Sequence, residues 1–168
     1  MDAIAPSASP SRFVVNRLFP YQVDNKFDGH RAALWLLGLF IALKLVMSVN
    51  SIVNTATVAS SADGIPLDTF GPAAAQAVLM LFALMMLGQL MLSLIALATL
   101  VRWRALVPFM YLVLIGEHLA RRIIVQSYAV ARVGTPAGVY VNYALLTLLV
   151  LGLVLALLPS SKASAATS

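Results

Sequence analysis

The chain of 168 residues is 61% hydrophobic and 10% charged, with a mean hydropathy of +0.94. About a quarter of the residues in a soluble domain are charged, so this composition excludes a secreted enzyme, a disordered regulator and a conventional DNA-binding domain. The net charge of +5 does not indicate nucleic acid as a partner, because the bases flank long apolar segments, where Lys and Arg set membrane topology. The absence of cysteine excludes disulfides, thiolate nucleophiles and Cys-ligated metal centres.

Residues 1–31 form the first segment, which we expect to be juxtamembrane. Prolines and charged residues interrupt its apolar side chains, so it lacks the continuous apolar run of a cleaved signal peptide. Between 13 and 27, aromatic and aliphatic residues are mixed with bases, which is typical of a segment that lies on lipid headgroups. A docking surface for a protein partner uses the same chemistry, and we favour the lipid interpretation.

Residues 32–158 form the membrane domain. A hydrocarbon core about 30 Å thick needs about 20 apolar residues in a helix, and four segments meet this requirement: 32–53, 73–101, 105–124 and 139–158. Pro159 ends the last of them. The sequence therefore predicts an all-α integral membrane protein, a four-transmembrane-helix bundle in the bacterial inner (plasma) membrane.

The connections between these spans differ in length. Residues 54–72 contain two acids, two prolines and two glycines, and we expect an extramembrane loop there. Only 102–104 separate the second and third spans, which forces an antiparallel hairpin, and the third link, around Arg132 and Pro136, is also short. The polar tail, 159–168, is expected to be disordered. Small residues at 71–77 would let another helix approach closely, within the bundle or from a second copy.

The bases at the span ends predict the orientation. If the N-terminus is inside, seven bases lie on the inner side and three near the outer ends. The inner set is Arg12, Arg17, Lys26, Arg31, Arg102, Arg104 and Lys162, and the outer set is Arg121, Arg122 and Arg132. Both termini are therefore predicted to be cytoplasmic.

Ionisable residues within spans are costly and are the best functional candidates. Lys44 lies 12 residues beyond Ala32, and Glu117 lies 12 beyond Ala105. At 1.5 Å per residue both are roughly 18 Å from the inner boundary. An ion pair between Lys44 and Glu117 is therefore geometrically allowed.

Helical spacing predicts which polar residues share a face. Lys44, Ser48 and Ser51 recur at intervals of four and three in the first span. In the third span, Glu117 and Arg121 form one pair four apart and His118 and Arg122 form another, while Gln89 lies near the middle of the second span. We expect these residues to form a polar seam inside the bundle, and we expect the last span to be the lipid-facing one.

The cluster has two interpretations. Lys44, Arg121 and Arg122 outnumber Glu117, so the site could hold a lipid phosphate, a carboxylate or another anion. Alternatively, Glu117 neutralises Lys44 and Arg121 in a structural network, while Arg122 extends to the outer headgroups. His118 could relay protons, but we favour a structural role with a hydrogen bond to Tyr111 or to the second span. Bis-histidine haem is disfavoured, because the only other histidine, His30, lies at the inner boundary.

No hydrolase, metalloprotease, P-loop or dinucleotide-binding motif is present, and we expect neither an enzyme nor a cofactor. The leading hypothesis is a non-enzymatic accessory or ligand-binding membrane protein whose buried polar cluster binds an anionic lipid or small anion, or pins the bundle. The alternative is a small oligomeric transporter or proton-coupled carrier. The expected partners are membrane lipids and either further copies of the chain or a larger membrane complex, with no nucleic acid.

Overall fold

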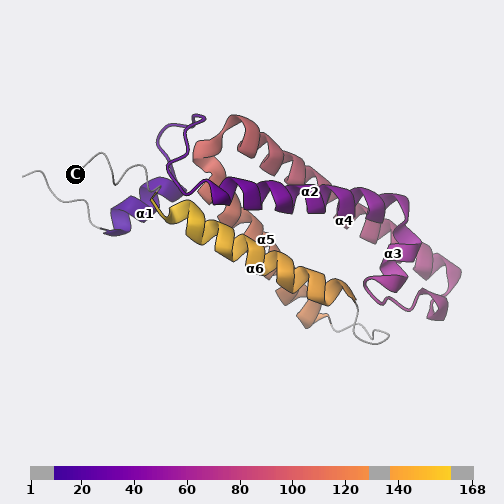
Figure 1. The fold of residues 1–168 in the computed structure, drawn as a ribbon. Coiled ribbons are helices and arrows are strands. Elements are labelled where there is room, and N and C mark those ends of the chain that lie inside the picture. The colour runs from indigo at the N-terminus through magenta and orange to yellow at the C-terminus, as the bar shows by residue number, and fades with distance from the viewer. Residues whose placement is uncertain (1–9, 129–136, 160–168) are drawn as a thin grey trace, which may run out of the picture.

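The computed structural model describes residues 10–128 and 137–159, and this part of the chain is helical with no β-strand. Figure 1 shows the arrangement of the helices. In chain order they are α1 (Pro10–Leu18), α2 (Ala32–Val53), α3 (Thr55–Ser61), α4 (Pro72–Arg102), α5 (Val107–Ser127) and α6 (Ala137–Leu157), with single 3-10 turns at Leu67–Thr69 and Arg104–Leu106.

Three of these helices, α2, α4 and α6, are long and apolar enough to cross a membrane. Their bounds agree with the first, second and fourth predicted spans to within two residues. The 21-residue α5 is of similar length, but it carries Glu117, Arg121 and Arg122 and is not among the three. It begins at Val107 because Arg104–Leu106 form a 3-10 turn and Pro108, which lacks an N–H, suits the first turn of a helix.

The described ends of the chain meet at one end of the bundle, which we call the terminal end. There the backbone N–H of His30 donates to the oxygen of Leu155, 3.0 Å away, and that of Ala105 donates to Asp24, 3.2 Å away. We call the opposite end, which carries α3, the α3 end (Figure 1). Helix α2 packs closely on α4 and α6, and α5 packs on α6, whereas α4 and α5 make few contacts.

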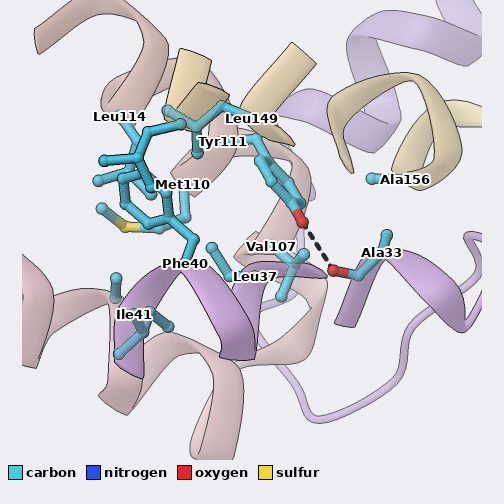
Figure 2. Packing of buried hydrophobic residues seen from close by; sticks show 12 residues of the cluster. Ala33, Leu37, Phe40, Ile41, Val107, Met110, Tyr111, Leu114, Leu149 and Ala156 are labelled. Carbon is cyan, nitrogen blue, oxygen red and sulfur yellow. Dashed lines mark hydrogen bonds between the residues drawn. The ribbon is translucent and has the colours of Figure 1, made fainter. Parts of the chain in front are cut away.

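The apolar core lies between α2, α5 and α6 (Figure 2). Tyr111 is its largest fully buried side chain, and Leu37, Phe40 and Leu149 surround it. Gly152 of α6 lets the Tyr111 ring approach, since a Cβ built at Gly152 would lie 2.3 Å from ring atoms of Tyr111.

The prediction that the last span is the lipid-facing one is wrong. Helix α6 buries Leu145, Leu149, Gly152 and Ala156, and a larger share of it is buried than of α4. The buried face of α6 is apolar and combines two leucines with two small residues. Helix α4 instead exposes most of its apolar surface, and the small residues at its start are mostly exposed as well.

The prediction of a loop at 54–72 is wrong in part, because this segment contains α3 and a 3-10 turn. The Thr, Ala, Val and Ser residues of 55–61 allow a helix, and Gly64, whose φ is 66°, lies in the turn that follows it. The link around Arg132 and Pro136 and the tail from 160 onward lie outside the described residues.

The N-terminal segment is tied to the end of α6. The Arg17 guanidinium donates to the oxygens of Leu157 and Leu158 and to that of Asp28, each at 3.0 Å. The Phe19 ring packs on Phe109 of α5, with centroids 5.5 Å apart. Val15, Phe19 and Tyr21 nevertheless remain more than half exposed, so this segment keeps an open apolar side.

Candidate functional site

A cavity of about 280 Å³ lies between α2, α4, α5 and α6 toward the α3 end, and residues of α3 and the loop after it, including Val58, Asp63 and Ile65, line that end. We call it the polar cavity. Every predicted site residue except Glu117 lines it: Lys44, Ser48, Ser51, Gln89, His118, Arg121 and Arg122. The structure thus brings the residues of three predicted spans to one place.

Helix α2 contributes Lys44, Ser48 and Ser51, whose spacing places them on one face. All three are buried, and Ser48 is only 1% exposed. Ser48 Oγ has no hydrogen-bond partner among the described residues. Lys44 Nζ lies 5.8 Å from the centroid of the Phe40 ring, within the about 6 Å over which a cation–π attraction acts.

Helix α4 contributes Gln89, which is 4% exposed. Its Oε1 accepts a hydrogen bond from Arg121 Nη2 at 2.8 Å, a contact that bridges α4 and α5. Its Nε2 is buried and has no partner in the described part of the chain. Gln89 therefore still has donors to offer a ligand.

The ion pair between Lys44 and Glu117 that the sequence allows is absent from the described residues. Glu117 instead pairs with Arg121, whose Nε and Nη2 both donate to Glu117 Oε1. The two side chains are four residues apart on α5, so they meet without crossing the bundle. This pairing leaves Lys44 without a carboxylate within 4 Å in that part of the chain.

His118 bonds to α6. The prediction of a bond to Tyr111 or to the second span is wrong, because His118 Nε2 lies 3.0 Å from the backbone oxygen of Asn142 and Tyr111 bonds to Ala33. A carbonyl only accepts, so Nε2 carries the proton. His118 Nδ1 is buried without a partner in the described ranges.

Arg122 contacts α6, and its extension to the outer headgroups stays a prediction. Its Nη2 donates to the hydroxyl of Tyr143, and its guanidinium carbon lies 4.3 Å from the centroid of that ring. Asn142 and Tyr143 also line the cavity and were not predicted from the sequence. Their polarity at the start of an apolar span was the available signal.

The lining combines apolar walls with hydrogen-bonding groups. Met47, Phe82, Met85, Met86 and Leu146 provide apolar surface. Lys44, Arg121 and Arg122 carry positive charge, and Asp63 is the one acid among the lining residues. Among the described residues, the buried atoms without a hydrogen-bond partner are Ser48 Oγ, Gln89 Nε2 and His118 Nδ1. The first two can donate, as can the Lys44 ammonium, which has no carboxylate within 4 Å in that part of the chain. No group of three or more His, Cys, Asp or Glu side chains suited to a metal occurs in 10–128 and 137–159.

The walls of the polar cavity differ in how tightly they are packed. Toward the terminal end, the buried side chains around Tyr111 and Phe40 fill the space between the helices. Between α4 and α5 the wall is looser, because these helices pack little on each other and diverge from their connection (Figure 1). The lining residues Met85 and Val125 are 43% and 44% exposed there. Met47 of α2 and Tyr143 of α6 are also exposed, at 38% and 48%, so lining residues of all four helices reach the outer surface of the bundle.

The sequence matches no protein-family model, and no curated protein or solved structure shows a significant match to it.

Proposed function

We propose that the chain is a four-span, non-enzymatic protein of the bacterial inner membrane that binds an anionic amphiphile in the polar cavity. The amphiphile carries a carboxylate or phosphate headgroup and an acyl chain. The observation that carries this proposal is the surplus of positive charge and unpartnered donors in a buried, laterally accessible cavity.

The fourth span in this proposal is α5. Its 21 residues rise roughly 30 Å, the thickness of a hydrocarbon core. Its charges have partners within the protein: Glu117 and Arg121 pair with each other, and Arg122 contacts Tyr143. Internal partners are the usual condition under which a membrane span carries ionisable groups.

Cytoplasmic termini form part of the proposal. Arg17, Lys26, Arg31, Arg102 and Arg104 lie at the terminal end, whereas Arg121 and Arg122 lie toward the α3 end. An excess of bases marks the cytoplasmic side of short-looped membrane proteins. The polar cavity then lies in the outer half of the bilayer.

Charge and access together favour an amphiphile over a small free anion. The headgroup would meet Lys44 Nζ, Gln89 Nε2 and Ser48 Oγ, and its charge would offset the excess that Glu117 leaves unmatched. The volume of about 280 Å³ is small beside typical ligand pockets of about 300–1,000 Å³. This volume suits a headgroup and the first part of one acyl chain. The rest of the acyl chain would leave the cavity between Met85 and Val125.

The test is equilibrium binding to the purified full chain in detergent, with a long-chain fatty acid, its uncharged methyl ester and a lysophosphatidic acid as probes. We expect the charged probes to bind and the ester to bind at least about tenfold more weakly, since one charge-assisted contact is worth that factor. Lys44→Met should weaken the charged probes by a similar factor. Lys26→Met, which removes an exposed charge at the terminal end, should not.

Two results would count against the proposal. One is equal binding of the acid and its ester by the wild type. The other is unchanged binding by Lys44→Met at an unchanged melting temperature. Either result would mean that the polar cluster only stabilises the helix bundle. The transporter alternative has no observation in its favour, because the core around Tyr111 separates the cavity from the terminal end.

A further inference from the structure

A second cavity lies at the terminal end, on the outer face where the start of α2 meets the end of α4. Its volume is about 570 Å³, and the residues that line it include Asn25, Arg31, Trp35, Gly38, Leu100 and Arg104. We call it the α2–α4 groove. It shares no lining residue with the polar cavity.

The polar lining of the groove is cationic. Arg31 and Arg104 come from opposite walls, Asn25 adds an amide, and no acid belongs to the lining. Arg104 Nε donates to the oxygen of Leu100 at 3.1 Å, which fixes the guanidinium at the end of α4. Nearby Asp24 is already engaged, because its carboxylate accepts from the Lys26 backbone N–H at 3.0 Å and lies 3.9 Å from Lys26 Nζ. The lining therefore carries two positive charges and no negative one.

The rest of the groove is apolar and leads into the membrane-capable part of the helices. Leu34, Gly38 and Leu100 line it, and Gly38 lies six residues, or roughly 9 Å, beyond the start of α2. Gly38 leaves the space open, since a Cβ there would meet only a Leu100 methyl, at 3.5 Å. Trp35 is 81% exposed and Trp103 is 44% exposed, as expected of tryptophans at a headgroup interface.

We propose that the α2–α4 groove is a binding site for an anionic phospholipid. The phosphate binds between Arg31 and Arg104, where guanidinium groups can donate in pairs, and one acyl chain lies along Leu34, Gly38 and Leu100. With the terminal end in the cytoplasm, the lipid comes from the inner leaflet, the side opposite the polar cavity.

The experiment is native mass spectrometry of the full chain extracted from vesicles of equal parts phosphatidylcholine and phosphatidylglycerol. We expect the wild type to retain phosphatidylglycerol preferentially. Arg31→Gln with Arg104→Gln should lower that preference about tenfold. The control, Arg102→Gln, removes a base at the same end but outside the groove lining and should keep the preference.

Two further arms separate phosphate recognition from chain recognition. Gly38→Leu fills the apolar part while leaving both arginines, and it should also lower retention. Soluble glycerol phosphate should not displace the lipid, and displacement would mean that the groove takes a free phosphate instead.

Equal retention of the two lipids by the wild type would overturn the proposal. An equal loss of the phosphatidylglycerol preference in the groove variant and its control, both with the wild-type melting temperature, would overturn it as well. Lys44→Met should keep phosphatidylglycerol whatever its effect on fatty acid binding, so failure at one cavity is distinguishable from failure at the other.

Discussion

The hydroxyl of Tyr111 in α5 donates a hydrogen bond to the backbone oxygen of Ala33 in α2, 2.7 Å away, and both residues are fully buried (Figure 2). The Tyr111 ring also packs against Gly152 of α6. This hydrogen bond thus links α5 to α2 on the side of the polar cavity that faces the terminal end.

Tyr111→Phe should lower the stability of the bundle by about 1 kcal/mol, because it removes one buried hydrogen bond and keeps the ring. Thermal unfolding in detergent measures the effect. Tyr140→Phe is the matched control, since Tyr140 is 67% exposed and should tolerate loss of its hydroxyl. Equal melting temperatures for the wild type and Tyr111→Phe would show that the bond adds nothing.

Gly152→Ala should destabilise the protein by about 1–3 kcal/mol, the usual cost of overpacking a core. The new methyl group would overlap the Tyr111 ring, which is held on all sides and cannot swing away. Gly88→Ala in α4 is the control, because no heavy atom lies within 4 Å of a Cβ at that position. A Gly152→Ala protein that melts no lower than Gly88→Ala would contradict the close packing of Tyr111 on Gly152.

Two features could be predicted from the sequence. The length of the apolar segments predicts α2, α4 and α6, and the four-residue spacing of Lys44 and Ser48 places both on one face of α2. Partner choice could not be predicted in the same way. Glu117 could reach Lys44 or Arg121 on depth and spacing alone, and only the side-chain packing selects Arg121.

Contacts between segments far apart in sequence were the other limit. The bond from His118 to the backbone of Asn142 depends on how α5 and α6 are offset, which no local pattern encodes. The burial of α6 was missed for a related reason. A helix of Leu, Val and Ala has the composition of both a lipid-facing and a buried span. Contacts between distant segments, such as that of Gly152 with the Tyr111 ring, distinguish the two.

Glu117→Leu should destabilise the protein by about 2 kcal/mol, because it leaves the partly buried Arg121 without its carboxylate. Adding Arg121→Met should recover more stability than adding Lys44→Met, since Arg121 is the residue that Glu117 contacts. Melting temperatures of the single and the two double variants decide the matter. Greater recovery with Lys44→Met would mean that Glu117 serves Lys44 across the bundle.

Arg17→Ala should loosen the end of α6 without unfolding the bundle. The Arg17 guanidinium satisfies the last carbonyls of α6, which have no partner within the helix. Burial lowers the pKa of Arg17 and nearby Asp28 raises it, but an arginine stays charged at physiological pH, so the contact persists. Hydrogen exchange should speed up at His30, whose N–H bonds to Leu155. Arg102→Ala, at the end of α4, should leave that exchange rate unchanged.

The proposed topology can be tested cleanly because the chain has no native cysteine, so each introduced thiol is the only one. Gln22→Cys, Thr69→Cys and Ser127→Cys place exposed thiols before α2, before α4 and at the end of α5. With four spans and cytoplasmic termini, an impermeant maleimide added to intact spheroplasts should label Thr69→Cys and Ser127→Cys. It should label Gln22→Cys only after permeabilisation. If α5 does not cross, Ser127→Cys should label together with Gln22→Cys, and the opposite pattern at all three positions would place the termini outside.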